Sequence, residues 1–224
     1  SPCYSAVNIY ALEWVYHHAT SERLRQQAAR TLDYLYADVF QHWHWEAGIG
    51  AGTHSRAYAD DRETGMSLVS CLVFKQCGQP LRISMTPFLY VFAVNDYPVP
   101  ERIRAMARKE KLVPLSLRTR IHESGETVES SLYLTKGFSL ASQTGRRSLY
   151  EDRPIWALPF QTTSAGSKTE RRASFITPKP TTKHVTVAAL QEGPVAIVLY
   201  EADLKDSEQR VARLRLDIEP RDGG

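Results

Sequence analysis

A run of chemically active side chains lies in the sequence HSRAYADD. His54, Arg56 and Tyr58 supply an imidazole, a guanidinium group and a phenol, and Asp60 and Asp61 supply two carboxylates. Every second side chain of an extended segment points to one side, and residues four apart on a helix are neighbours. Either conformation therefore gathers the polar set of His54, Arg56, Tyr58 and Asp60. Such a set suits acid–base chemistry on a substrate that carries a negative charge.

Histidine, tryptophan and glutamate precede this run in the sequence HWHWE. His42, His44 and Glu46 belong to metal-binding residue types, but two histidines at this spacing reach one ion only in an extended segment. We therefore predict no bound metal ion, and we expect no cofactor. Trp43 and Trp45 are either platforms that stack against sugar rings or simple core residues.

A purely structural interpretation of the same segment stays open. The glycines of GIGAG let the backbone approach a ligand closely. A glycine-rich connection between helices, however, needs no ligand. In this interpretation Arg56 pairs with a neighbouring aspartate and Tyr58 covers the end of a helix.

The first half of the chain has a helical period, which predicts helices over residues 5–18, 22–40, 66–77 and 100–111. Ser21 suits the N-cap of the second helix, and Pro100 suits the first position of the fourth. The apolar spacing is that of Val7, Ala11, Trp14 and His18 in the first helix, and of Leu24, Ala28, Leu32, Leu35 and Val39 in the second.

The period changes near Leu115, where polar and apolar residues begin to alternate. LSLRTRI and TVESSLYLT flank the turn sequence HESGE, which predicts a hairpin. Further short alternating segments follow as far as residue 219, with turn residues such as those of LQEGPV between them. We therefore expect an α+β protein with a helical domain over residues 1–112 and an antiparallel β-sandwich over residues 113–224.

Charge and composition exclude some classes of function. Lys and Arg total 28 against 25 for Asp and Glu, a net charge of +3 that is too small to indicate nucleic-acid binding. No apolar run is long enough for a membrane span. Three cysteines, an odd number without metal-type spacing, are expected to be buried free thiols. The sequence does not indicate an oligomeric state.

Two longer stretches resemble heparinase II/III-like proteins. SPCYSAVNIYALEWVYHHA and the later GAGTHSRAYADD are similar to the last helices of their α/α toroid, and YLTKGFSLASQTGRRSLYEDRPIWAL is similar to their early sandwich strands. The resemblance spans about residues 1–190 and implies the C-terminal part of an α/α toroid followed by an antiparallel β-sandwich. A complete toroid needs more helices than this chain supplies. The family also favours a secreted or periplasmic location.

Many members of that superfamily are polysaccharide lyases, which cleave glycans that contain uronic acid by β-elimination. The resemblance therefore implies an oligosaccharide or polysaccharide substrate. In such a reaction Arg56 would neutralise the uronate carboxylate, His54 would take the proton, and Tyr58 would protonate the leaving oxygen. The residues expected to contact the substrate around them are Tyr4, Trp43, His44, Glu46, Asp60 and Asp61.

Two other functions remain open from the sequence. A glycoside hydrolase needs two carboxylates beside the scissile bond, and Glu46, Asp60, Asp61 and Glu63 are available for that role. Nothing in the sequence fixes the separation of any such pair. A non-catalytic module that binds carbohydrate or mediates assembly would keep the same fold without the chemistry.

Overall fold

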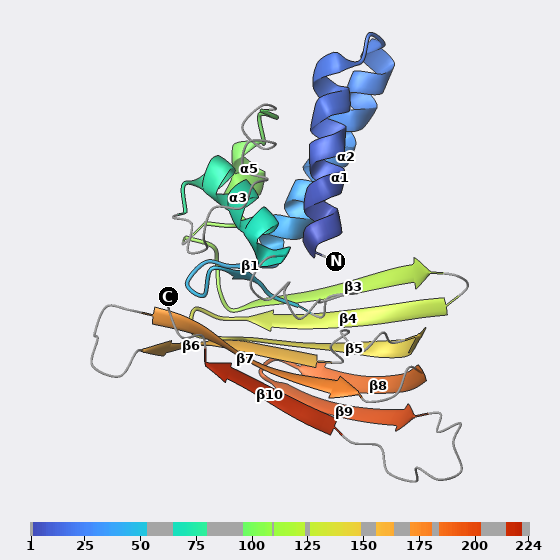
Figure 1. Ribbon diagram of the computed structural model, residues 1–224, viewed down its shortest axis with the longest axis vertical. Helices are drawn as coiled ribbons and strands as arrows, with labels where there is room; N and C mark the ends of the chain where they lie inside the picture. The colour runs from blue at the N-terminus through green and yellow to red at the C-terminus, as the bar shows by residue number, and fades with distance from the viewer. Residues whose placement is uncertain are drawn as a thin grey trace. The chain divides into compact units, whose positions relative to one another are not determined.

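The computed structural model describes most of the chain as two compact units (Figure 1). The described residues are 2–52, 65–79, 96–108, 110–123, 126–148, 156–163, 171–180, 184–202 and 214–220. The helical unit comprises Ser1–Gly50 and Ala57–Lys111, and the sheet unit comprises Ala51–Arg56 and Leu112–Gly224. The chain thus mixes helices with antiparallel sheets, in the α-then-β order that the change of period predicts.

The helical unit is built from helices and one very short hairpin. Its elements are α1 (Pro2–His18), α2 (Glu22–Gln41), β1 (Trp43–His44), β2 (Ile49–Gly50), α3 (Gly65–Cys77) and α5 (Glu101–Arg104). Helices α1 and α2 lie side by side and are joined by only three residues (Figure 1). The first three predicted helices are therefore confirmed.

Helix α2 buries one continuous face. Ala28, Leu32, Tyr36 and Phe40 recur every four residues and are all buried. Leu24, which the sequence analysis placed on this stripe, is 46% exposed because the buried face begins one turn later. Ser21 occupies the predicted N-cap position, although its side chain makes no capping hydrogen bond.

Helix α1 does not bury the stripe that predicted it. Ala6, Ile9 and Glu13 are each completely buried, whereas Val7 and Trp14 are 48% and 55% exposed. The helix is apolar on two sides, so its apolar spacing could not reveal which side faces the core. The inward side packs against α2 and α3.

The fourth predicted helix is much shorter than expected. We predicted helix over residues 100–111, but α5 ends at Arg104. Pro100 takes the N-cap position instead of the first helical position. Beyond Arg104 the amides of Met106 and Ala107 bond to carbonyls three residues earlier, in the tighter geometry of turns. Lys111 then contacts the end of α2.

The sheet unit contains eight described strands, all paired antiparallel. They are β3 (Leu115–Glu123), β4 (Glu126–Leu134), β5 (Ser139–Ser148), β6 (Trp156–Thr163), β7 (Arg171–Pro180), β8 (His184–Glu192), β9 (Val195–Ala202) and β10 (Leu214–Pro220). The predicted hairpin at HESGE is confirmed, since β3 pairs with β4 from Glu123 opposite Glu126 to Leu115 opposite Leu134. The predicted turn at LQEGPV likewise joins β8 to β9.

The sheet branches at strand β5. This strand pairs with β4 over most of its length, with β6 at Ala141 and Ser142, and with β8 from Gly145 to Ser148. One arm continues from β6 to β7 and β10, and the other continues from β8 to β9. Gly145 lies where pairing with β8 begins, at a φ of 132°. A Cβ atom there would lie 2.7 Å from the carbonyl oxygen of Thr127, so only glycine fits without a shift of the backbone.

Leucines from β3 and β4 form the described core of the sheet unit. Leu132, Leu134 and Ala141 are buried together with Ala51, the residue that directly follows β2. Leu115 and Leu117 pack against them from β3. Residue 51 is therefore fixed by packing at the start of the segment that leads to HSRAYADD.

Two smaller expectations concern the cysteine thiols and membrane-spanning helices. Cys71 is buried and Cys77 is partly buried, both as free thiols, as expected for these two residues. Burial raises the pKa of the Cys77 thiol to about 11, which keeps it protonated and unreactive. Within the described part of the chain, none of the helices combines the length and the apolar character that a membrane crossing requires.

The core of the sheet unit gives a first testable prediction. Leu132→Ala removes a side chain that is only 3% exposed and should lower the free energy of unfolding by about 2–5 kcal/mol. Urea denaturation followed by the β-sheet circular dichroism signal measures this loss. Leu112→Ala is the matched control, because Leu112 is 89% exposed and its truncation should change stability by no more than about 0.5 kcal/mol. Equal effects of the two variants would contradict the described core.

Candidate functional site

Of the predicted site, the structure describes the hairpin that precedes the sequence HSRAYADD. The residues that lie outside the described part are His54, Arg56, Tyr58, Asp60 and Asp61. Tyr4 lies in α1, but its side chain is also outside the described part. The roles proposed for these six residues therefore stay predictions, while Trp43, His44 and Glu46 can be placed.

Trp43 anchors the hairpin to the core of the helical unit. Its side chain is 1% exposed and packs among the residues of that core. The indole Nε1 donates a hydrogen bond to Oε1 of Gln79 at 2.6 Å. Nε2 of Gln79 in turn donates to the carbonyl oxygen of Trp45, also at 2.6 Å. The buried amide of Gln79 thus binds one tryptophan by its side chain and the other by its backbone.

His44 closes the turn between the two strands of the hairpin. It is 1% exposed, and its Nδ1 accepts a hydrogen bond from the backbone amide of Ala47 at 3.2 Å. An accepting Nδ1 carries no proton, so the neutral ring holds its proton on Nε2. The amide of Gly48 donates to the carbonyl oxygen of His44 at 2.9 Å, and Gly48 has a φ of 67°, which favours glycine.

Burial gives the hairpin residues a packing role. Trp43 belongs to the core, and Trp45 is partly buried and packs against it, which supports the core interpretation of both tryptophans. Neither Trp43 nor His44 offers an open surface to a sugar ring in the described structure. Glu46 is partly exposed. The predicted substrate contacts of Trp43, His44 and Glu46 stay predictions.

His42 belongs to the end of α2 and not to the hairpin. It is the C-cap residue of that helix, and its Nδ1 lies 2.6 Å from the carbonyl oxygen of Asp38 and 3.6 Å from the Asp38 carboxylate. His42 and His44 therefore have different partners. Across the described ranges, no three His, Cys, Asp or Glu side chains gather in a way that could hold a metal ion.

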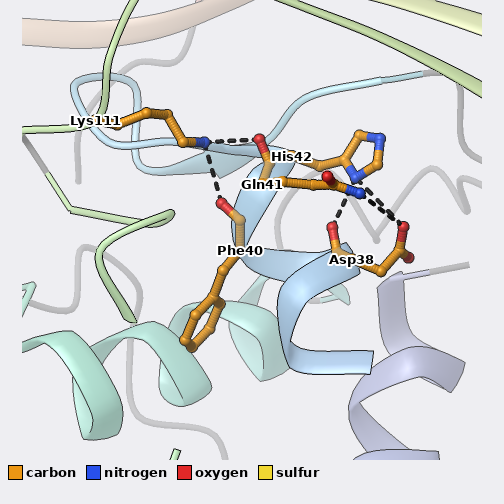
Figure 2. Close-up of polar contacts among 5 residues, drawn as sticks. All are labelled: Asp38, Phe40, Gln41, His42 and Lys111. Atoms are coloured by element: carbon orange, nitrogen blue, oxygen red, sulfur yellow. Dashed lines mark hydrogen bonds and ion pairs between the residues drawn. The ribbon is translucent and has the colours of Figure 1, made fainter. Parts of the chain in front are cut away.

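Lys111 caps the same helix end from far along the chain (Figure 2). Its Nζ donates hydrogen bonds to the carbonyl oxygens of Phe40 at 3.0 Å, Gln41 at 2.6 Å and Trp43 at 2.9 Å. The last carbonyls of a helix have no partner within the helix and carry its negative dipole end. One ammonium group therefore satisfies the end of α2 and the first residue of β1 together.

Two physical effects act in opposite directions on the charge of Lys111. Burial lowers its pKa to about 7 from an ordinary value of 10.5, because the ammonium loses its hydration. The three carbonyl oxygens and the negative end of the α2 dipole favour the charged form. The charge of Lys111 should therefore respond to pH near neutrality.

A second polar cluster lies inside the helical unit and was not predicted. Glu13 is completely buried in α1, and the hydroxyl of Tyr36 in α2 donates to its Oε1 at 2.6 Å. Nζ of Lys75 in α3 lies 3.7 Å from Oε2 of Glu13 and 3.7 Å from the carboxylate of Asp96. Burial raises the pKa of Glu13, while the hydroxyl of Tyr36 and the charge of Lys75 oppose that shift.

Tyr97 extends this cluster toward α2. Its hydroxyl bonds to the Asp33 carboxylate at 2.8 Å and to the carbonyl oxygen of Ala29 at 3.1 Å. Nε2 of Gln76 donates to the Tyr97 carbonyl oxygen at 3.2 Å. A carboxylate with a raised pKa often marks an active site. Glu13 has no exposed surface, and its contacts tie the three helices together.

One feature of the sequence does point to this cluster. Glu13 is the single Asp, Glu, Lys or Arg residue in the seventeen residues of α1. A lone acid in an otherwise uncharged helix indicates either a buried ion pair or a functional group. The sequence could not name its partners, because they come from α2, α3 and the segment at residues 96–97.

The comparisons with known proteins give one similarity. A family described as a domain of unknown function, DUF8769, matches residues 1–107. The matched range includes α1, α2, the β1–β2 hairpin, α3 and α5. Neither the curated proteins nor the solved structures gave a match. The first half of the chain is therefore similar to this domain, and the description of the domain assigns it no activity.

The buried Lys111 gives a prediction on pH. Its lowered pKa means that the unfolded chain keeps a proton on this lysine between about pH 7 and 10.5 that the folded protein releases. The stability of the wild type relative to Lys111→Met should therefore rise with pH across that range and stay level below pH 7. The slope should not exceed about 1.4 kcal/mol per pH unit. Chemical denaturation at a series of pH values measures it.

Lys136→Met is the matched control for this experiment, because it removes one positive charge from an exposed position in the sheet unit. It should not reproduce the change with pH. If the stability difference between the wild type and Lys111→Met stays level, or falls as the pH rises, burial does not control the charge of Lys111.

Proposed function

We propose that the protein acts on carbohydrate, as a polysaccharide lyase similar to heparinase II/III-like proteins. The observation that carries the proposal is the fixed hairpin directly before HSRAYADD. Trp43 and Ile49 are buried in the helical unit, and Ala51 is buried in the sheet unit. Packing therefore fixes the backbone as far as Ala51, three residues before HSRAYADD begins. Catalytic residues are commonly carried by segments that a rigid scaffold positions.

The proposed fold is the C-terminal part of an α/α toroid followed by a β-sandwich. Two features support it. Helices α1 and α2 form a pair joined by three residues, with α3 packed on α1, as in folds built from successive helix pairs. The branch of the sheet at β5 gives two arms of strands, which is how one antiparallel sheet can supply two layers.

The proposed chemistry is β-elimination beside a uronate carboxylate. Arg56 binds that carboxylate and neutralises it, which makes the C–H bond on the neighbouring carbon more acidic. Neutral His54 takes this proton, the electron pair forms a carbon–carbon double bond, and the bond to the glycosidic oxygen breaks. The Tyr58 hydroxyl gives its proton to the leaving oxygen. The products are a new sugar hydroxyl and an unsaturated uronate, and no oxidant or cofactor is needed.

The rest of the predicted set would bind the glycan around the reacting bond. Asp60 and Asp61 follow the catalytic run, and Glu46 is partly exposed on the hairpin before it. Carboxylates accept hydrogen bonds from sugar hydroxyls. Trp43 and His44 support the site by holding the hairpin.

Replacement of Tyr58 tests the proposal. In the full-length protein Tyr58→Phe should lower the rate of unsaturated uronate formation by about 10²–10⁴-fold, because it removes the proton donor. Ultraviolet absorbance of the new double bond measures the rate on polysaccharides that contain uronic acid. Tyr34→Phe is the matched control, since Tyr34 is a 71% exposed tyrosine on α2 and its hydroxyl should not affect the rate.

Two results would contradict the proposal. Full activity of Tyr58→Phe on a substrate that the wild type cleaves would remove Tyr58 from the mechanism. Cleavage of neutral glycans alone, with new reducing ends but no ultraviolet absorbance, would replace elimination by hydrolysis. Glu46, Asp60 and Asp61 would then be the carboxylates to replace.

A further inference from the structure

The carboxylate of Glu13 is enclosed by the core of the helical unit, where its side chain is 0% exposed. Oε1 accepts a hydrogen bond of 2.6 Å from the Tyr36 hydroxyl in α2, whereas the buried Oε2 has no hydrogen-bond partner among the described residues. Nζ of Lys75 in α3 lies 3.7 Å from Oε2, farther than a hydrogen bond allows. A buried carboxylate keeps its charge only when close donors replace the water that it loses, and Glu13 has few of them.

Lys75 also serves a second carboxylate. Its Nζ lies 3.7 Å from Asp96, as far as it lies from Glu13. The Asp96 side chain is 82% exposed, so water stabilises its charge, whereas the charge of Glu13 depends on the surrounding protein. Asp96 also repels a negative charge on Glu13. His17, one turn after Glu13 in α1, is a further titratable group at Asp96, with its Nε2 3.1 Å from the Asp96 carbonyl oxygen.

The groups that face Glu13 leave the loss of hydration as the dominant effect. Burial raises the pKa of Glu13, and the Tyr36 hydroxyl, the charge of Lys75 and the backbone amide of Tyr97 oppose that shift without cancelling it. Burial and the neighbouring Glu13 raise the pKa of Tyr36 well above its ordinary value. The Tyr36 hydroxyl therefore keeps its proton and remains a donor to Glu13.

We propose that Glu13 is a proton-binding site inside the helical unit, and that proton uptake there stabilises this unit in mildly acidic surroundings. The proton binds Oε2, because Oε1 already accepts a hydrogen bond from Tyr36. Its uptake removes the buried negative charge, and the charge of Lys75 remains paired with Asp96.

Proton uptake leaves the contacts between the helices and residues 96–97 in place. The Tyr97 hydroxyl bonds to the Asp33 carboxylate at 2.8 Å and to the carbonyl oxygen of Ala29 at 3.1 Å. Nε2 of Gln76 donates to the Tyr97 carbonyl oxygen at 3.2 Å. These three contacts do not use the carboxylate of Glu13, so acid removes the cost of a buried charge and keeps them. The inference goes beyond the proposed lyase function and does not depend on it.

The direction of the pH dependence follows from the difference in proton binding between the folded and unfolded states. The pKa of Glu13 is higher in the folded protein than the 4.5 of an ordinary glutamate. Between pH 4.5 and the folded pKa, the folded protein therefore holds a proton that the unfolded chain releases. The contribution of Glu13 to stability rises as the pH falls through this window, and it is level below pH 4.5 and above the folded pKa.

Chemical denaturation of the wild type and Glu13→Gln, followed by helical circular dichroism at a series of pH values, tests the inference. Glutamine cannot take up the proton. The equilibrium constant for folding of the wild type relative to this variant should therefore rise as the pH falls through the window, by up to about tenfold per pH unit. Glu110→Gln is the matched control, because it removes an exposed carboxylate of the same unit and should not reproduce this change.

The carbon-13 signal of the Glu13 carboxyl group gives a second measurement, which does not require the buried variant to fold. Its titration midpoint in the wild type should lie above 4.5. Asp96→Asn changes an exposed side chain and should lower this midpoint, because it removes the repulsion by Asp96 and the competition for Lys75. A purely structural role of Glu13 would not link its titration to an exposed residue.

Three results would overturn the inference. The first is a midpoint of Glu13 at or below 4.5 in the folded wild type. The second is a stability difference between the wild type and a folded Glu13→Gln variant that stays level, or shrinks, as the pH falls. The third is an unchanged midpoint in Asp96→Asn, because Lys75 would then not be shared between the two carboxylates.

Discussion

Helix α2 ends in carbonyl groups that have no partner within the helix. Lys111 donates hydrogen bonds to the carbonyl oxygens of Phe40 and Gln41, and the amide of the C-cap residue His42 also donates to that of Phe40. The contact joins residues 68 to 71 positions apart in the sequence. The contact fixes the connection between α2 and the β1–β2 hairpin, because the same ammonium group also binds the carbonyl oxygen of Trp43. Lys111 is also the last residue of the helical unit, so the end of α2 and the exit to the sheet unit are fixed together.

After the end of α2, further contacts fix the hairpin residues in the order in which they follow along the chain. Trp43 is held by the core and by Gln79, and His44 and Gly48 close the turn. Ile49 in β2 and Ala51 directly after it are both buried. The sequence HSRAYADD begins three residues later. The proposed lyase reaction needs its base, acid and carboxylate-binding group held in place, and these contacts fix the backbone shortly before the residues proposed for those roles.

The elements that depend on local sequence could be predicted, and those that depend on distant contacts could not. The β3–β4 hairpin follows from strict alternation on both sides of one turn sequence, and α2 follows from its four-residue period. The buried side of α1 could not be predicted, because both of its sides are apolar. The end of α5 at Arg104 could not be predicted either, because the helical spacing of the sequence continues to residue 111 while the amides of Met106 and Ala107 already bond to carbonyls three residues earlier.

The candidate site likewise has features that the sequence could predict and features that it could not. Residue types and spacing single out His54, Arg56 and Tyr58, and their chemistry stays a prediction because they lie outside the described residues. The sequence could not show that Trp43 and His44 are buried, since alternating His and Trp residues fit an exposed platform equally well. The partners of Glu13 come from three separate parts of the chain, so the sequence marks the lone acid but not its cluster.

Amide hydrogen exchange of the hairpin tests the central claim, that Lys111 holds the backbone in front of the reactive run. In the wild type, exchange at Ala47 and Gly48 should be slow, because both amides are hydrogen-bonded to His44. In Lys111→Met these two amides should exchange at least about tenfold faster, while amides in the β3–β4 hairpin keep their wild-type rates. Wild-type exchange rates at Ala47 and Gly48 in a folded Lys111→Met variant would contradict the claim.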